Sequence, residues 1–285
     1  MSNPRSVPII QRTKVGSGAD PLVMVTAYDT PTANVVDAAG VDMILVGDSL
    51  AMVVLGYEDT RSVTTEQMAH HVGAVARAKP DALIVADMPW MSYHLSTEDA
   101  VRNAATLVRS GAEAVKLEGG QNRLDAIEAI ANTEIPVMGH LGLTPQSSLK
   151  LGGFKVQAKT AEQARDLIQQ AKMLESVGCF SIVLEGIPSI VGQEITQAIS
   201  IPTIGIGAGP DTDGQVLVFH DIVGLASDYL PRFVRQYCDS YDQQVAATAQ
   251  FAADVRSNDY PKPSESYAGP EKLRDQLSDQ QLSEQ

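Results

Sequence analysis

Eight short apolar runs, separated by longer amphipathic stretches, constrain the fold of this 285-residue chain more than any other feature. Because the runs are apolar at consecutive positions, they are typical of parallel strands that helices cover on both faces. Eight strand-and-helix repeats favour a (β/α)8 barrel over an open doubly wound sheet, which would carry a G-x-G-x-x-G motif after its first strand. The expected strands lie in LVMVTAYD (22–29), MILVGDS (43–49), ALIVADMP (82–89), AVKLEGG (114–120), IPVMGHLG (135–142), SIVLEGIP (181–188), IPTIGIGAG (201–209) and, less clearly, GQVLVFHD (214–221).

Helix start and stop signals lie between these runs. Thr64 is followed three residues later by Gln67, and Ser96 by Asp99, which is the spacing of a capping box. The stretches 96–111 and 160–178 both end on glycine, the residue preferred just after a helix C-terminus. The spacing therefore predicts helices that alternate with the eight strands.

The domain organisation follows from the same pattern and from a change in composition near the C-terminus. Residues 1–260 are predicted to form a single barrel domain with extra C-terminal helices after about Leu230. Residues 261–285 are polar and rich in Gln, Ser and Glu, so we expect a flexible tail there.

Charge and cysteine content exclude several classes of function. The chain carries 35 acidic and 21 basic residues, a formal net charge of −14, which argues against a nucleic-acid or anionic-membrane partner. Its two cysteines, Cys179 and Cys238, lie far apart and have no CxxC spacing, so neither a disulfide framework nor a structural zinc site is expected. The chain has no signal-peptide pattern and no run near the ~20 apolar residues of a membrane helix, which predicts a soluble cytoplasmic protein.

Polar residues end most of the predicted strands, at the barrel face where chemistry is expected. They are Asp48 and Ser49, Asp87, Lys116 and Glu118, His140, and Glu185. Four carboxylates with one ammonium and one imidazole would repel one another unless a cation lay among them. Hard oxygen donors without thiols favour Mg2+, which keeps several waters and leaves room for a chelating substrate.

Each residue also has a structural explanation. Asp48 alone is better explained as a turn former or helix cap, and only its pairing with Asp87 favours a ligand. An exposed ion pair of Lys116 with Glu118 is the structural alternative, but a strand inside a parallel barrel has no exposed face, which favours a functional role. His140 is compatible with either packing or binding. Glu185 follows an apolar run, where burial would raise its pKa and suit it to proton abstraction.

Two other stretches have competing explanations. The glycine-rich GIGAGPDTDG (205–214) is compatible with a phosphate-binding loop, but the absence of a nearby Lys or Arg favours tight turns. The stretch MPWMSY (88–93), with the single tryptophan, is expected to be core or a subunit contact.

The strand-end segments, taken in order, resemble the ketopantoate hydroxymethyltransferase family from about Pro21 to about Tyr260. That family is a (β/α)8 barrel of the phosphoenolpyruvate mutase and isocitrate lyase group, and its members form large homo-oligomers, commonly decamers. The departures are peripheral, namely the tail after about Tyr267 and Gly186 after the glutamate. The segments are TAYD, VGDSL, ADMPW, VKLEGG, GHLGLTPQS, GGFKVQ, LEGIP and IGIGAGPDTDGQVLV.

The resemblance implies a reaction and assigns residues to it. A one-carbon unit from 5,10-methylenetetrahydrofolate joins 3-methyl-2-oxobutanoate to give 2-dehydropantoate, a step of pantothenate synthesis. Asp48 and Asp87 match the Mg2+ ligands, with Glu118 close to the ion directly or through water. Ser49, Asp87 and Lys116 match residues that contact the keto acid, and His140 is a weaker match. Asp48 is also expected to contact the substrate, because it belongs to the same site. Glu185 matches the proton acceptor, and the resemblance assigns no folate-binding residue.

Two rival functions stay open at this point. The first is a Mg2+-dependent C–C or C–P lyase or mutase of the same barrel group, which would also form an enolate from a 2-keto acid. Such enzymes typically carry a cysteine in a flexible loop, and residues 143–157 contain none. The second is a non-catalytic barrel that binds a small acid, which would have no use for an unpaired base such as Glu185.

Overall fold

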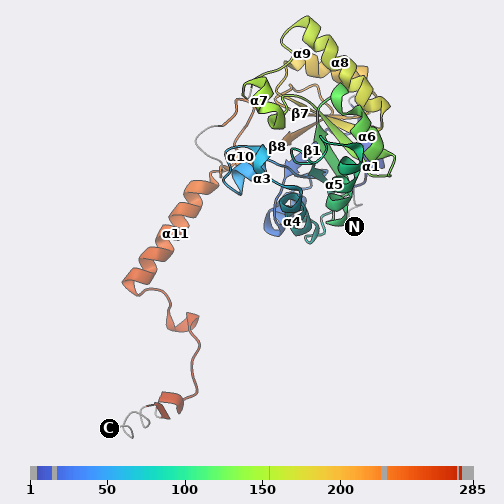
Figure 1. The fold of residues 1–285 in the computed structure, drawn as a ribbon. Helices are drawn as coiled ribbons and strands as arrows, with labels where there is room; N and C mark the ends of the chain where they lie inside the picture. Colours follow the sequence, from blue (N-terminus) through green and yellow to red (C-terminus); the bar gives the residue numbers. More distant parts are fainter. Residues whose placement is uncertain (1–4, 15–17, 154, 226–229, 275, 278–285) are drawn as a thin grey trace. The chain divides into compact units, whose positions relative to one another are not determined.

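The computed structural model describes the chain except for residues 1–4, 15–17, 154, 226–229, 275 and 278–285. By internal contacts the chain divides into residues 1–237 and residues 238–285. The first unit is a closed barrel of eight parallel strands in sequence order (Figure 1), so the expected fold class is confirmed. The strands are β1 (Leu22–Thr26), β2 (Met43–Val46), β3 (Leu83–Asp87), β4 (Ala114–Glu118), β5 (Val137–Gly142), β6 (Cys179–Glu185), β7 (Thr203–Ile206) and β8 (Gly214–Leu217).

Helices connect the strands on the outside of the barrel (Figure 1). The predicted caps form: Thr64 makes a full capping box with Gln67, and the Ser96 side chain accepts a hydrogen bond from the backbone of Asp99. The longer helices are α2 (Thr30–Ala38), α4 (Thr65–Ala76), α5 (Thr97–Arg109), α6 (Leu124–Ala131), α8 (Ala161–Ser176) and α9 (Ser189–Ala198). The short ones are α1 (Val7–Gln11), α3 (Leu50–Val53), α7 (Ser148–Leu151), α10 (Phe219–Val223) and the single 3-10 turns η1 (Thr60–Ser62), η2 (Gln121–Arg123) and η3 (Pro145–Ser147).

The barrel interior is apolar at the amino ends of the strands and polar at their carboxyl ends. Along β3, Leu83 and Val85 belong to an apolar cluster that also includes Ile10 of α1, and the next residue with the same orientation is Asp87. Along β4, Ala114 belongs to this cluster, and Lys116 and Glu118 continue the same face. Because side chains alternate along a strand, this period of two places charged groups above packed apolar layers.

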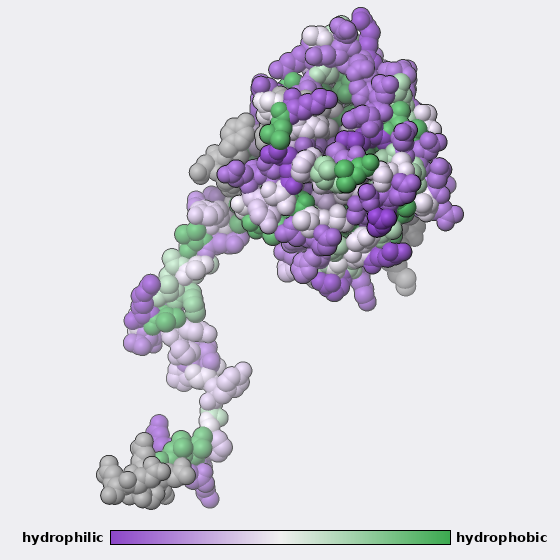
Figure 2. Space-filling view, viewed as in Figure 1, coloured by the Kyte–Doolittle hydropathy of each residue, from purple (hydrophilic) through white to green (hydrophobic). Residues whose placement is uncertain are grey.

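The surface of the barrel unit is largely hydrophilic on the face that Figure 2 shows. A second, larger apolar cluster lies between the strands and the helices and includes residues such as Ile44, Met68 and Leu107. Two packed layers, one inside the barrel and one outside it, therefore hold the strand ends in place.

The second unit contains α11 (Ser240–Ser257) and the 3-10 turn η4 (Pro263–Glu265). The Phe251 ring contacts the Tyr260 ring, with centroids 5.3 Å apart. The contact division at Tyr237 precedes the sequence-predicted boundary at residue 260, and that boundary stays a prediction. The expected flexible tail lies partly outside the described residues, at 275 and 278–285.

Candidate active site

The predicted site residues meet at the carboxyl ends of β2 to β6, and the strand register decides which of them are neighbours. Asp87 of β3 pairs with Lys116 of β4, and Glu118 pairs with His140 of β5. Glu185 ends β6 opposite Gly142. Asp48, Asp87, Lys116, Glu118 and His140 are each no more than 5% exposed. The structure therefore gathers into one cluster the residues that the sequence places up to 137 positions apart.

Lys116 and Asp87 form an ion pair, with Nζ 2.9 Å from Oδ1. Burial opposes the ammonium charge, but Asp87 and Glu118 outweigh it and raise the pKa of Lys116 above its usual range. The sequence left open whether Lys116 forms an exposed ion pair. The structure excludes an exposed ion pair, because the Lys116 and Asp87 side chains are both buried inside the barrel mouth.

His140 lies between Lys116 and Glu185. Its Nδ1 is 3.2 Å from the Lys116 ammonium, which can only donate a hydrogen bond, so Nδ1 accepts. Burial and the charge of Lys116 lower the pKa of His140 well below its usual range, which keeps the ring neutral. The remaining ring proton is therefore on Nε2, which lies 3.2 Å from Glu185 Oε2 without the alignment of a full hydrogen bond.

Glu185 has the character expected of a general base. Its side chain retains 14% exposure, so it is the most open of the three carboxylates on β3, β4 and β6. Burial raises the pKa of Glu185 to about 8, with Asp87 adding to this and Lys116 opposing it. A carboxylate with a pKa near neutrality is matched to proton abstraction from carbon.

Asp48 and Ser49 follow β2 and face the same cluster. The Asp48 backbone N–H donates to Asp87 Oδ2 at 3.0 Å, and the Ser49 hydroxyl lies 2.8 Å from the Tyr28 hydroxyl. A Cβ at position 47 would lie 2.9 Å from Ser49 Oγ, so a larger residue there would displace the Ser49 hydroxyl. The Asp48 carboxylate is thus not a simple turn former, because its side chain faces the other carboxylates.

Burial, with repulsion between the carboxylates adding to it, dominates the electrostatics of the cluster. Burial and the neighbouring Asp87 raise the pKa of Asp48 to about 7. Burial and Asp48 raise the pKa of Glu118 well above its usual range. One ammonium therefore leaves the negative charge of this cluster only partly compensated.

The donor chemistry of the cluster fits a divalent cation. Within the described ranges, no three His, Cys, Asp or Glu side chains are already arranged around a common point as metal ligands would be. In the arrangement observed, Lys116 faces Asp87 and the Gln146 amide faces Asp48. The raised pKa values nevertheless indicate a cluster short of positive charge, and its donors are hard oxygens. The ligand set Asp48, Asp87 and Glu118 stays a prediction.

The negative charge of the cluster, which Lys116 compensates only in part, predicts how the stability of the metal-free protein depends on pH. Between pH 7.0 and 8.5 the unfolded carboxylates are fully ionised, whereas the raised pKa values of Asp48, Glu118 and Glu185 keep protons bound in the folded state. Stability must therefore fall as pH rises through this window. We expect the melting temperature to drop by several degrees, and MgCl2 to raise it more at pH 8.5 than at pH 7.0. Calorimetry with and without MgCl2 measures both effects, and an equal effect of Mg2+ at the two pH values would contradict the charge argument.

Three residues that touch this cluster were missed by the sequence reasoning. Tyr28, Tyr93 and Gln146 are buried, and each hydrogen-bonds a predicted site residue or its backbone. Tyr93 lies in the stretch expected to be core or a subunit contact, and Trp90 of the same stretch is 41% exposed. Neutral polar residues in loops carry no pattern that would have identified them.

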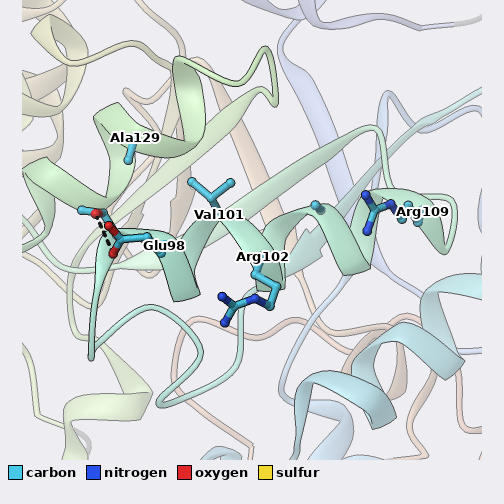
Figure 3. Close-up of a pocket in the computed structure, with 7 residues that line it drawn as sticks. Glu98, Val101, Arg102, Arg109 and Ala129 are labelled. Carbon is cyan, nitrogen blue, oxygen red and sulfur yellow. Dashed lines mark hydrogen bonds between the residues drawn. The ribbon is translucent and has the colours of Figure 1, made fainter.

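Two other features are separate from the cluster. The glycine-rich segment after β7 packs tightly: a Cβ on Gly209 would lie 2.4 Å from Ser189 Cβ, which supports the tight-turn interpretation. Figure 3 shows an open depression on the outer helices, lined by Glu98, Val101, Arg102 and Arg109 of α5 and by Ala129 of α6. Neither feature contributes a side chain to the cluster.

Comparison with known proteins identifies the family of this chain. The family model described as ketopantoate hydroxymethyltransferase matches residues 6–263. The chain belongs to the ketopantoate hydroxymethyltransferase family. The resemblance drawn from the strand-end segments is therefore confirmed, and so is membership of a family of transferase enzymes.

Relatives within the ketopantoate hydroxymethyltransferase family cover nearly the whole barrel. A protein from Ignicoccus hospitalis named 3-methyl-2-oxobutanoate hydroxymethyltransferase is 56% identical over 257 residues, which cover 90% of this chain and 97% of that protein. A protein of the same name from Methylobacterium sp. is 54% identical over 253 residues, which cover 89% and 88%. At these identities and coverages, each relative by itself also shows the family.

Solved structures show the wider fold group. A phosphonopyruvate hydrolase superposes with a TM-score of 0.58 at 11% identity and covers 98% of this chain and 97% of its own. A 2,3-dimethylmalate lyase, described as a member of the PEP mutase/isocitrate lyase superfamily, gives 0.56 at 15% identity and covers 99% and 98%. At these identities the likeness shows the barrel fold alone.

Among the helices of the described residues, none has the length and hydropathy needed to cross a membrane.

Proposed function

We propose that this chain transfers a hydroxymethyl group from 5,10-methylenetetrahydrofolate to 3-methyl-2-oxobutanoate, giving 2-dehydropantoate and tetrahydrofolate. One observation carries the chemical part of the proposal: Glu185, with a pKa raised to about 8, lies at the barrel mouth beside Lys116 and His140. Removal of the C3 proton of the keto acid is general-base work, and a carboxylate tuned in this way suits it. The family membership supports the identity of both substrates.

The residues act from two sides of the substrate. Glu185 accepts the C3 proton, and the electron pair left behind moves toward the keto oxygen to give an enolate. Lys116 places its ammonium near that oxygen, where negative charge develops. Water adds to the folate methylene carbon and its two carbon–nitrogen bonds break, which releases tetrahydrofolate and a one-carbon unit at the oxidation level of formaldehyde. The enolate carbon bonds to that carbon, and the oxygen that came from water takes the proton held by Glu185 and becomes the hydroxyl group. Ser49, held by Tyr28, and neutral His140 are donors suited to orient the keto acid.

We also propose one Mg2+ per subunit, held by Asp48, Asp87 and Glu118. When bound, the ion supplies Lewis-acid charge next to the keto and carboxylate oxygens of the substrate. The proposal is supported by the hard-oxygen donor set and by the shortage of positive charge in the cluster. One solved phosphonopyruvate hydrolase with this fold is described as a complex with oxalate and Mg++.

Self-association and location belong to the proposal as well. The family resemblance implies large homo-oligomers, commonly decamers, and the sequence pattern implies a cytoplasmic location. Sedimentation velocity of the full chain tests the first of these. A monomer at micromolar concentration would contradict it.

Proton exchange at C3 tests the reaction most directly. With 3-methyl-2-oxobutanoate in D2O and MgCl2, but without folate, we expect the C3 proton signal to disappear and the methyl doublet to collapse to a singlet. The reason is that Glu185 removes this proton before the folate reacts. Exchange is followed by proton NMR, with a reaction lacking Mg2+ and one lacking protein as controls. A rate equal to the protein-free control would contradict the proposal, and a lyase or mutase for another keto acid would give that result.

A further inference from the structure

Gln146 connects two of the proposed metal ligands, although the sequence analysis assigned it no role. Its Nε2 donates to Asp48 Oδ2 at 2.8 Å, and its backbone N–H donates to Glu118 Oε2 at 3.0 Å. The same Nε2 also donates to the carbonyl oxygen of Met88 at 3.0 Å. One buried residue therefore touches carboxylates that come from the ends of β2 and β4.

Tyr93 determines the orientation of the Gln146 side chain. Its hydroxyl donates to Gln146 Oε1 at 2.6 Å and accepts a hydrogen bond from the backbone N–H of Glu118 at 3.2 Å. The Met88 carbonyl only accepts, and the Tyr93 hydroxyl has its proton free to donate because it accepts from the Glu118 N–H, so Nε2 must face Met88 and Asp48 while Oε1 faces the hydroxyl. Every polar group of this amide is satisfied, which restricts it to one orientation.

Local structure holds the two donors in place. Gln146 is the second residue of η3, after Pro145, so its N–H has no partner within the turn and is free to bond Glu118. Tyr93 lies in the loop between β3 and α5, and its ring packs at 4.2 Å from the His94 ring. The network thus joins loops that follow β2, β3 and β5 to the end of β4.

We propose that Gln146, held by Tyr93, is a positioning residue that sets Asp48 and Glu118 for a divalent cation. This rests on the proposed metal site. Gln146 donates hydrogen bonds to Oδ2 of Asp48 and to Oε2 of Glu118. The other oxygen of each carboxylate accepts no hydrogen bond from Gln146. A neutral amide orients the carboxylates without neutralising the charge that attracts the ion, whereas a lysine or arginine here would compete with it.

Mn2+ binding to the full chain tests the proposal without using activity. Free Mn2+ is measured by its EPR signal during titration of wild type, Gln146→Met, Tyr93→Phe and the double variant. We expect Gln146→Met to weaken Mn2+ binding by roughly 10- to 100-fold, as for outer-shell partners of metal ligands. Tyr93→Phe should weaken it less. The double variant should resemble Gln146→Met, because Tyr93 acts through the same amide.

A matched control separates positioning from general stability. Thr196→Val removes a buried hydrogen bond of 2.7 Å to Thr203, which begins β7 at the opposite end of the barrel. This variant should melt at a lower temperature and bind Mn2+ as wild type does.

The possible results distinguish the proposal from the site on which it rests. Unchanged Mn2+ affinity in Gln146→Met would overturn the positioning role while leaving the metal site intact. Absence of Mn2+ binding by wild type would overturn the metal site and the positioning role with it. If Gln146→Met does not fold, Tyr93→Phe, which removes a single oxygen atom, decides the matter by the same titration.

Discussion

Turnover is expected to fall by about 10²- to 10⁴-fold when Glu185 is replaced by glutamine, while Mg2+ and keto-acid binding stay within a few-fold of wild type. Glutamine keeps the size of the side chain and its approach to His140 Nε2, which lies 3.2 Å from Glu185 Oε2. It loses only the ability to accept the C3 proton. Steady-state kinetics measure turnover, and calorimetry with the keto acid and Mg2+ measures binding.

The matched control for this variant is Glu194→Gln on α9, the helix that follows the same strand. Glu194 is exposed and removed from the cluster, so turnover should not change. Deuterium exchange at C3 should also be lost in Glu185→Gln and retained in Glu194→Gln. Wild-type exchange and turnover in Glu185→Gln would exclude Glu185 as the base.

The second large effect is expected for Asp48→Asn, which should weaken Mg2+-dependent keto-acid binding by about 100-fold or more. Loss of a direct ligand should exceed the roughly 10- to 100-fold effect of an outer-shell change. The variant should also be more stable than wild type at pH 8 without metal. The pKa of Asp48 is raised to about 7 by burial and by Asp87, so at pH 8 its charge destabilises the folded state. Calorimetric titration and thermal melts measure the two effects.

Asp213→Asn is the matched control for Asp48→Asn. Asp213 is buried just before β8, at the amino ends of the strands, and its Oδ2 lies 3.0 Å from Lys14 Nζ. Because this carboxylate has a cation partner, its loss should lower stability and leave Mg2+ affinity unchanged. Equal Mg2+-dependent keto-acid binding in wild type and Asp48→Asn would remove Asp48 from the metal site.

Most of the fold was predictable because the signals were local and repeated. The eight apolar runs coincide with β1 to β8, and the cap at Thr64 forms as its spacing with Gln67 indicates. Fully buried parallel strands need apolar residues on both faces, so each strand is visible in the sequence by itself. A polar residue that ends such a run is equally visible, which is why Asp87 and Glu185 were identified as site residues.

Contacts between loops were not predictable in the same way. Gln146 and Tyr93 are 53 positions apart, and their hydrogen bond depends on where the loops after β3 and β5 come to lie. Nothing in the composition of either loop indicates that a neutral amide faces Asp48. Such a contact is set by tertiary packing, which local patterns do not encode.

The sequence by itself determined the barrel, the strand ends that carry charge, and the resemblance to the ketopantoate hydroxymethyltransferase family, because each depends on residue type and spacing along the chain. The tertiary structure alone decided which charges are neighbours. The strand register places Asp87 opposite Lys116 and Glu118 opposite His140, and closure of the barrel brings Glu185 to the same cluster. Burial at that point then raises the pKa of Glu185 to about 8, because water no longer stabilises its charge.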